Sequence, residues 1–177
     1  MTTATLPAHR TPGLTIRPCR PADVPLVRGL SDHASATSLY HRFFVGSPRI
    51  PAGYLRSLQT VDHWNREILL AIPDSGDHTV AIAEYVRDRT DPRTAEMAML
   101  VADAWQRHGL SRLLIDALGE LAHARGITHF TAETLPDNQA AQAAILRHRP
   151  GALTTHHGDS LLFHMPVLAQ TPREVPQ

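Results

Sequence analysis

The chain has 177 residues, 42% of them hydrophobic and 5% aromatic, which is enough apolar material for one compact domain with a mainly aliphatic core. The 17 basic and 17 acidic side chains give a formal net charge of +0, which argues against a protein that coats nucleic acid or is drawn to a membrane surface. The single cysteine, Cys19, excludes an internal disulfide and a structural zinc site of several cysteines.

All 17 basic residues are arginine, so chemistry that needs a lysine of the chain itself, such as a phosphate-loop lysine or a Schiff base, is excluded. The N-terminus "MTTATLPAHRTPG" has no basic start followed by an apolar core, and no apolar run approaches the ~20 residues of a membrane span. We therefore expect a soluble cytoplasmic protein with no membrane partner. Residues 1–12 and 169–177 are expected to be disordered tails around one domain at 13–168.

The first third of the chain predicts one strand and then helices. Apolar residues alternate with polar ones in "GLTIRPCR", which is typical of a strand over residues 13–20. Pro21, a residue suited to the first turn of a helix, opens a segment with apolar residues at helical spacing. A further helix is predicted over residues 35–44 and a weaker one over residues 51–60.

The middle of the chain predicts three strands and a long helix. Two strands are expected at 66–73 and 78–88, separated by the turn "DSGD", and a third at 94–102. The loop "AWQRHGLSR" follows. The helix after it runs to about Arg125 and is closed by Gly126.

The last third adds a strand at 127–135, a helix capped by Asp137 and Asn138, and a final strand pair around a "GD" turn. Hairpins with helices inserted between them indicate one domain of mixed α/β or α+β class. We find no internal repeat and no low-complexity segment.

The loop "AWQRHGLSR", residues 104–112, joins a predicted strand to a predicted helix and has two interpretations. Gly109 would let a ligand approach the backbone closely, and the first turn of the helix offers unpaired amide donors at the positive end of the helix dipole. Together these features would form a phosphate cradle that needs no lysine. The alternative is ordinary turn chemistry, since many strand–loop–helix junctions carry one glycine and bind nothing.

Several segments resemble the GNAT superfamily of acyl-CoA N-acyltransferases. The loop of that family reads Gln/Arg-x-x-Gly-x-Gly/Ala, and Gln106, Gly109 and Ser111 occupy those positions here. The segments "ETLPDNQAAQAAI" and "TIRPCRPADVP" also match, and the resemblance covers residues 14–167. Two further segments, "ASATSLYHRFF" and "AEMAMLVADAWQRHGL", are similar to the GNAT domains of bacterial protein-lysine acetyltransferases.

This resemblance implies a single GNAT-like domain with a twisted, mostly antiparallel central sheet of about six to seven strands and helices on both faces. It implies acetyl-CoA as cosubstrate, with the pyrophosphate on the amides of the loop and the pantetheine paired with the end of the preceding strand. Asn138 would contact the cofactor as well as cap its helix. The implied cofactor residues are Met99, Leu100, Val101, Gln106, Arg107, His108, Gly109, Leu110, Ser111, Arg112 and Asn138.

Glu96 is the predicted general base, because relatives carry a catalytic glutamate at this point of the strand. Period-two alternation places it on one strand face with Ala98 and Leu100, and it could act directly or through one water. The alternative is a strand-edge glutamate in solvent. Glu84 and Glu133, on neighbouring strands, are weaker candidates that are better explained as structural or solvated residues.

Two features depart from the family pattern. Ser111 places a hydroxyl where the family prefers no bulk, so it would either crowd the phosphate or donate to it. The tyrosine that many relatives place in the last helix, as the acid for the departing thiolate, is absent, because Tyr40, Tyr54 and Tyr85 all precede the loop. A thiol with a pKa of roughly 8.5 can leave as a thiolate near neutral pH, so such an acid helps but is not essential.

We expect an acetyl-CoA-dependent N-acetyltransferase that moves an acetyl group to a primary amine by direct attack, with a protein lysine as the first acceptor and a small amine close behind. Four residues of the predicted helix either shape the acceptor side of the site or simply pack the helix against the core: Tyr40, Arg42, Phe43 and Phe44. A non-catalytic CoA-binding module is the alternative from another class. The 12 histidines show no metal-binding spacing, so no metal is expected. A homodimer is a further possibility among its partners.

Overall fold

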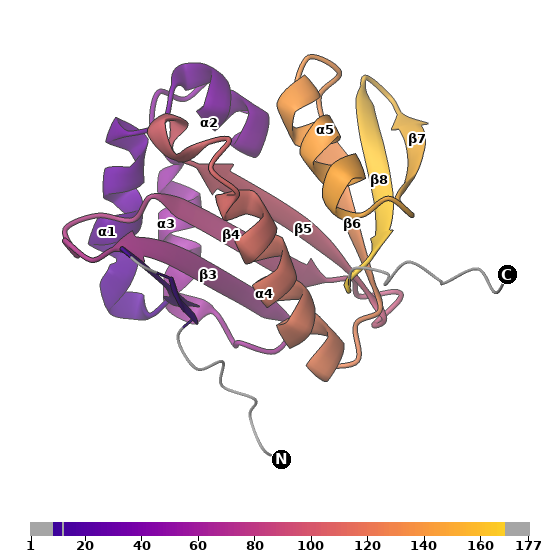
Figure 1. Cartoon of the computed structure of the whole chain (residues 1–177), viewed down its shortest axis with the longest axis horizontal. Helices are drawn as coiled ribbons and strands as arrows, with labels where there is room; N and C mark the ends of the chain where they lie inside the picture. Colours follow the sequence, from indigo (N-terminus) through magenta and orange to yellow (C-terminus); the bar gives the residue numbers. More distant parts are fainter. Residues whose placement is uncertain (1–8, 12, 169–177) are drawn as a thin grey trace, which may run out of the picture.

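The computed structural model describes residues 9–11 and 13–168, which build one central sheet with helices packed against it (Figure 1). The sheet in the described residues has eight strands in the order β1-β2-β3-β4-β5-β6-β8-β7. Neighbouring strands pair antiparallel, except for β5 and β6, which are parallel. The mixed, mostly antiparallel sheet predicted from the sequence is confirmed.

Most strands lie where the alternation of apolar residues predicted them. One strand was not predicted. It is β1, a three-residue edge strand that pairs with β2 and lies inside the segment 1–12, which we predicted to be a disordered tail. The rest of that segment, and the predicted tail 169–177, lie outside the described residues. The strands are β1 (His9–Thr11), β2 (Leu14–Pro18), β3 (Arg66–Pro73), β4 (Ala81–Arg87), β5 (Thr94–Val101), β6 (His129–Thr134), β7 (Leu153–His157) and β8 (Ser160–Pro166).

The helices cover both faces of the sheet. Glu84 and Tyr85 are neighbours on β4 and point to opposite faces. Glu84 contacts Arg42 of α2, whereas Tyr85 contacts Arg125 at the end of α4, so α2 and α4 lie on opposite faces. No helix in the described residues is long and apolar enough to cross a membrane. The helices are α1 (Val24–Gly29), α2 (Ala36–Phe43), α3 (Ala52–Ser57), α4 (Leu110–Ala124) and α5 (Gln139–His148).

The long helix α4 is tightly fixed to the sheet and to α5. Gly119 lies so close to the chain after β8 that a Cβ there would stand 2.1 Å from the carbonyl oxygen of Val167. The guanidinium of Arg149, which is 2% exposed, donates to the same carbonyl at 3.1 Å and to Asp116 of α4 at 3.0 Å. α4 is therefore a rigid support for the loop that precedes it. Its buried stripe consists of Leu110, Leu114, Ile115, Ala117, Leu118, Gly119, Leu121 and Ala122.

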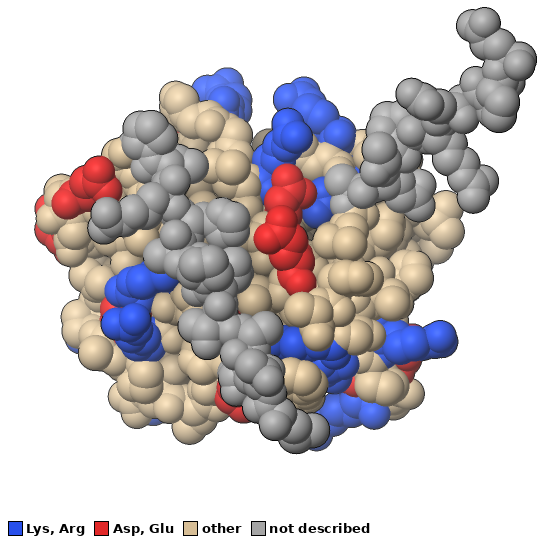
Figure 2. Space-filling view, turned by 60° about the horizontal axis from the view of Figure 1, so that its bottom comes forward, with Lys and Arg blue, Asp and Glu red and all other residues tan. Residues whose placement is uncertain are grey.

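Charged side chains form small separate groups on the face of the molecule in Figure 2, with uncharged residues between them. This distribution agrees with the formal net charge of +0. Electrostatic attraction of a polyanion needs a broad region of positive potential. The described part of this face presents no such region.

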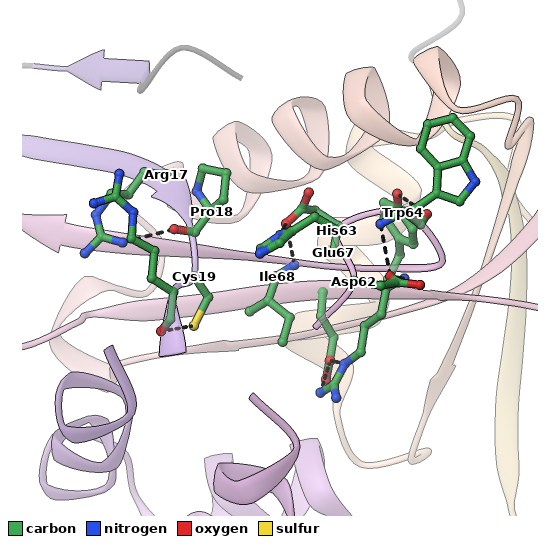
Figure 3. A network of polar contacts seen from close by, with 12 residues as sticks. Arg17, Pro18, Cys19, Asp62, His63, Trp64, Glu67 and Ile68 are labelled. Atoms are coloured by element: carbon green, nitrogen blue, oxygen red, sulfur yellow. Dashed lines mark hydrogen bonds and ion pairs between the residues drawn. The ribbon is translucent and has the colours of Figure 1, made fainter. Parts of the chain in front are cut away.

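A polar network fixes the start of β3 at the end of the sheet opposite the loop after β5 (Figure 3). Glu67, which is 1% exposed, accepts from the Ile68 amide at 3.0 Å and lies 2.8 Å from His63 Nδ1. Its second oxygen accepts from Arg125 at 2.8 Å. Asp62 accepts from three amides of the turn before β3. These contacts satisfy a buried charge and hold the strand.

Candidate active site

β5 and β6 run side by side for only three residue pairs and then part. The parallel pairing joins residues 94–96 to residues 129–131, and no further pair follows in the described residues, although β5 continues to Val101 and β6 to Thr134. The outer edges stay paired, β5 with β4 and β6 with β8. We call the gap between residues 97–101 and 132–134 the strand opening; its main-chain groups need partners.

Met99, Leu100 and Val101, the residues predicted to pair with pantetheine, lie along this opening on the edge of β5. Their side chains pack into or against the hydrophobic core. What the edge presents is therefore main chain, and main-chain amides and carbonyls are the partners that an amide-bearing arm would pair with, as an added strand does.

The loop after β5 turns sharply into α4 at the wide end of the strand opening. Arg107 and Gly109 have φ angles of 64° and 81°, both in the left-handed region. That conformation is costly for arginine and natural for glycine. Gly109 is the cap residue of α4, and a Cβ added to it would meet no atom within 4 Å. The space beside Gly109 is therefore open to a ligand.

The start of α4 offers amide donors to that space. No side chain in the described residues caps this helix. The N–H groups of its first turn have no intrahelical acceptor, and the helix dipole makes their surroundings positive. Ser111 is half-buried in this turn, while Arg107, His108 and Arg112 are exposed. The predicted cradle residues are thus brought together, and their backbone fits a phosphate group.

Three polar side chains that we did not single out from the sequence tie this loop to α2. Asp103 accepts from the Ser35 amide at 3.1 Å and from the Ser38 hydroxyl at 2.7 Å. Ser35 also caps α2 by accepting from the Ser38 amide. Gln106 donates to the Val101 carbonyl at 3.2 Å. The loop is held from β5 and from α2, and the Ser-x-x-Ser spacing before a helix was the signal available for α2.

Glu96 lies at the last residue pair before the strands part. Its side chain is exposed, and it shares a strand face with Ala98, which stands opposite Glu84 on β4. Glu96 therefore points to the face on which α2 lies. A ligand bound along residues 97–101 would lie beside this carboxylate where the strand opening is narrowest. The same exposure also fits the alternative, a solvated glutamate.

Glu84, the weaker base candidate on β4, is a structural residue. It is 6% exposed, accepts from Arg66 at 2.7 and 2.9 Å, and also pairs with Arg42 of α2. Both guanidinium groups lie over the ring of Tyr54, at 5.3 and 5.5 Å, and burial raises the pKa of its hydroxyl. Phe43 packs edge-on against the same ring. Arg42 and Phe43 therefore anchor α2.

Glu133 lies on β6 in the strand opening, two residues beyond Thr131, which pairs with Glu96, and so on the same face. It accepts from the Ser160 hydroxyl and lies 3.4 Å from His157 Nδ1. Unlike Glu84, it is exposed.

Three further predicted residues are Asn138, Tyr40 of α2 and Phe44, which follows the last residue of α2. Asn138 caps α5 by accepting from the Ala141 amide at 3.2 Å, so the capping half of its expected role is confirmed. Tyr40 and Phe44 are 44% and 43% exposed and do not bury the helix. They are free to contact an acceptor.

Two parallel strands that part beside an uncapped helix start leave main-chain groups and amide donors open to a ligand, and similarity to known proteins identifies the family. Residues 34–148 match the model of the acetyltransferase (GNAT) family. Acetyltransferase Pat of Mycolicibacterium smegmatis is 31% identical over 126 residues, which are 71% of this chain and 37% of that protein. The chain therefore belongs to the acetyltransferase (GNAT) family.

Two solved structures show the same fold. The GNAT domain of S. lividans PAT superposes with a TM-score of 0.79 at 25% identity, over 86% of this chain and 90% of that one. A cAMP-binding acyltransferase from Mycobacterium smegmatis gives a TM-score of 0.61 at 24% identity, over 87% of this chain and 43% of that one. The chain spans 37% of the length of the curated relative it matches.

The predicted domain limits, the homodimer and the cytoplasmic location stay predictions.

Proposed function

We propose that this chain binds acetyl-CoA and transfers its acetyl group to a primary amine by direct attack. The observation that carries the proposal is the parting of β5 and β6 beside the uncapped start of α4. Acetyl-CoA supplies the activated acetyl thioester. The protein supplies donors for its pyrophosphate at the helix start and main-chain partners for its pantetheine along the strand edge.

The proposed cofactor contacts follow from this arrangement. The pyrophosphate is held by the amides of residues 106–112, with Gly109 allowing the closest approach. The main chain of residues 99–101 pairs with pantetheine, and Asn138 contacts the cofactor from the start of α5. Ser111, half-buried in the first turn of α4, is placed to donate its hydroxyl to a phosphate oxygen.

In this proposal Glu96 takes the proton that the amine loses. A lysine-like amine has a pKa of about 10.4, so its neutral form costs about 4.6 kcal/mol at pH 7. A general base typically contributes ~10²–10⁴-fold, or roughly 3–5 kcal/mol of barrier. Glu96 is exposed at the narrow end of the strand opening, whereas Glu84 is held by two arginines. This contrast favours Glu96.

A protein lysine is the proposed acceptor, and a small amine is the second candidate. The similarity of "ASATSLYHRFF" to protein-lysine acetyltransferase domains supports the first. So does the face of the sheet to which Glu96 points, because α2 lies on it. The exposed Tyr40 and Phe44 offer apolar contact to a peptide, and the second carboxylate, Glu133, adds attraction for an ammonium group. A small amine would use the carboxylates alone.

The proposal is tested with labelled acetyl-CoA, a lysine peptide and a small amine over a series of pH values. Because the chain has no lysine, label found on lysine belongs to the acceptor. We expect Glu96→Gln to bind acetyl-CoA normally and to lose ~10²-fold or more of its rate near neutral pH. Raising the pH rescues part of the loss, because more of the amine is already neutral.

Glu133→Gln is the comparison variant, since it removes the neighbouring carboxylate from the same face: it should weaken binding of the amine without the pH-dependent loss of rate expected for Glu96→Gln. Equal rates for wild type and Glu96→Gln at every pH would remove Glu96 from the mechanism and move the base to Glu133. Binding of acetyl-CoA without transfer to any amine or lysine-bearing protein would favour a non-catalytic CoA-binding module.

A further inference from the structure

Two side chains on either side of the strand opening carry a buried polar atom that has no hydrogen-bond partner among the described residues. They are His41 of α2, through Nε2, and Thr134 at the end of β6, through Oγ1. Buried polar groups are nearly always paired, so each such atom needs an explanation. Four more such atoms occur among the described residues: the hydroxyl of Tyr54 and the Nε atoms of Arg42, Arg87 and Arg125. Tyr54 and Arg42 belong to the Glu84 cluster, and Arg87 donates to the carbonyl of Arg125, which pairs with Glu67 at the far end of the sheet.

His41 connects α2, which packs on one side of the strand opening, to the segment that follows β6 on the other side. It is the neighbour of Arg42, which anchors α2 on β4 through Glu84. Its Nε2 lies 3.2 Å from Asp137, in the segment between β6 and α5, but the pair is not aligned for a hydrogen bond. Figure 1 shows α2 and α5 at the end of the sheet where β5 and β6 part. His41 therefore bridges the opening on the α2 face.

Thr134 borders the opening from the opposite face. It is the last residue of β6 and is 4% exposed. By alternation it shares a face with Ala132 and Phe130, and Phe130 packs beside Tyr85 on the α4 side. Thr134 pairs with β8 through its main chain, so its hydroxyl is the group left without a partner. A chain threaded between β5 and β6 would run between the two faces that carry these atoms.

We propose that His41 Nε2 and Thr134 Oγ1 hydrogen-bond the pantetheine arm of acyl-CoA, one from each face of the sheet. This inference rests on the proposed function. The arm carries two amides and, at its end, the thioester carbonyl, so it offers both donors and acceptors. A neutral imidazole nitrogen and a hydroxyl can each serve as donor or acceptor. In this proposal the two atoms that lack a hydrogen-bond partner gain one when the cofactor binds.

The test compares two probes, acetyl-CoA and 3′-phosphoadenosine 5′-diphosphate, which lacks the pantetheine arm. We expect His41→Phe and Thr134→Val each to weaken acetyl-CoA binding by about 3- to 10-fold in calorimetry, the worth of one hydrogen bond, and to leave the nucleotide affinity unchanged. His123→Phe, on the exposed part of α4, and Thr154→Val, on the exposed strand β7, are matched controls with wild-type affinity for both probes.

A second readout separates a ligand contact from a structural role. Without ligand, Thr134→Val should melt at or above the wild-type temperature, because it removes an unpaired buried hydroxyl. With acetyl-CoA its gain in melting temperature should be smaller than that of wild type. If both variants kept the wild-type affinity for acetyl-CoA, or lost affinity equally for acetyl-CoA and for the nucleotide, the two hydrogen bonds would be refuted and the proposed function would stand. A wild-type protein that does not bind acetyl-CoA would overturn the proposed function as well.

Discussion

Three glutamates on one face of the sheet differ in their surroundings, and this difference separates the candidate base from its neighbours. Glu84 is 6% exposed and paired with two arginines, and Glu133 accepts from a serine hydroxyl. Glu96 is exposed, and no ion pair joins it to another described residue. The sequence predicted all three on strands but could not rank them by contact, because the arginines that neutralise Glu84 come from a distant helix and an adjacent strand.

At the residue scale, Asp23 is expected to make the protein less stable in acid. Its carboxylate accepts from Arg17 at 2.6 and 2.7 Å and from the Arg20 amide at 2.8 Å. Burial acts to raise the pKa of Asp23, but these hydrogen bonds outweigh it and hold that pKa below its ordinary value. The stabilisation is therefore present above about pH 4 and is lost as the pH falls through the lower pKa of the folded state.

Asp23→Asn should accordingly reduce the free energy of unfolding by about 1–3 kcal/mol near pH 7, where the charged hydrogen bonds exist. The difference from wild type should shrink below about pH 4. Denaturant titrations of both proteins across this range measure it. A loss that stays constant with pH would show that the carboxylate charge is not the cause.

At the scale of elements, the contact between α4 and the chain after β8 depends on Gly119. A Cβ would stand 2.1 Å from the Val167 carbonyl oxygen, which is backbone and cannot move alone. We expect Gly119→Ala to destabilise the protein by roughly 1–3 kcal/mol or more, although alanine is the better helix former. Gly29→Ala is the control, because a Cβ there meets nothing within 4 Å. Equal melting temperatures for the two variants would refute this close approach.

The two ends of α4 allow the phosphate cradle to be tested at matched backbone strain. Gly109 before the helix and Gly126 after it both have φ of +81°, and a Cβ on either meets nothing within 4 Å. Gly109→Ala and Gly126→Ala should lower stability by similar amounts, about 1 kcal/mol. Only Gly109→Ala should also weaken acetyl-CoA binding, by ~10-fold or more, because its methyl group enters the phosphate space. Calorimetry that finds equal affinities would exclude the cradle.

The sequence predicted the elements well because each depends on local pattern. The strand at 66–73 agrees with β3 residue for residue, and Gly126 follows the end of α4 as expected. The pairing between strands is not local. β5 and β6 pair at three positions and then part, while β4 and β8 stay paired with their outer edges, and only the resemblance to a family suggested a site there. β1 was missed because it is three residues long, too short to show an alternation of apolar and polar residues.

At the scale of the whole molecule, α2 connects the loop after β5, the sheet and the segment before α5. Ser38 donates to Asp103 in the loop after β5, Arg42 pairs with Glu84 on the sheet, and His41 lies 3.2 Å from Asp137 before α5. These three contacts join segments that lie 42 to 96 residues apart in sequence, so no sequence pattern reports them. A helix held at three points keeps its exposed Tyr40 and Phe44 at a fixed distance from the strand opening.

The proposed activity of the protein is the transfer of an acetyl group from acetyl-CoA to an amine. The most direct measurement incubates the purified chain with acetyl-CoA and a lysine peptide, and counts released CoA thiol against acetylated lysine in the same sample. We expect the two to appear in equal amounts and at the same rate, with both dependent on the protein. Acetyl-CoA that binds and raises the melting temperature without any enzyme-dependent release of thiol, across a panel of peptides and small amines, would contradict the account.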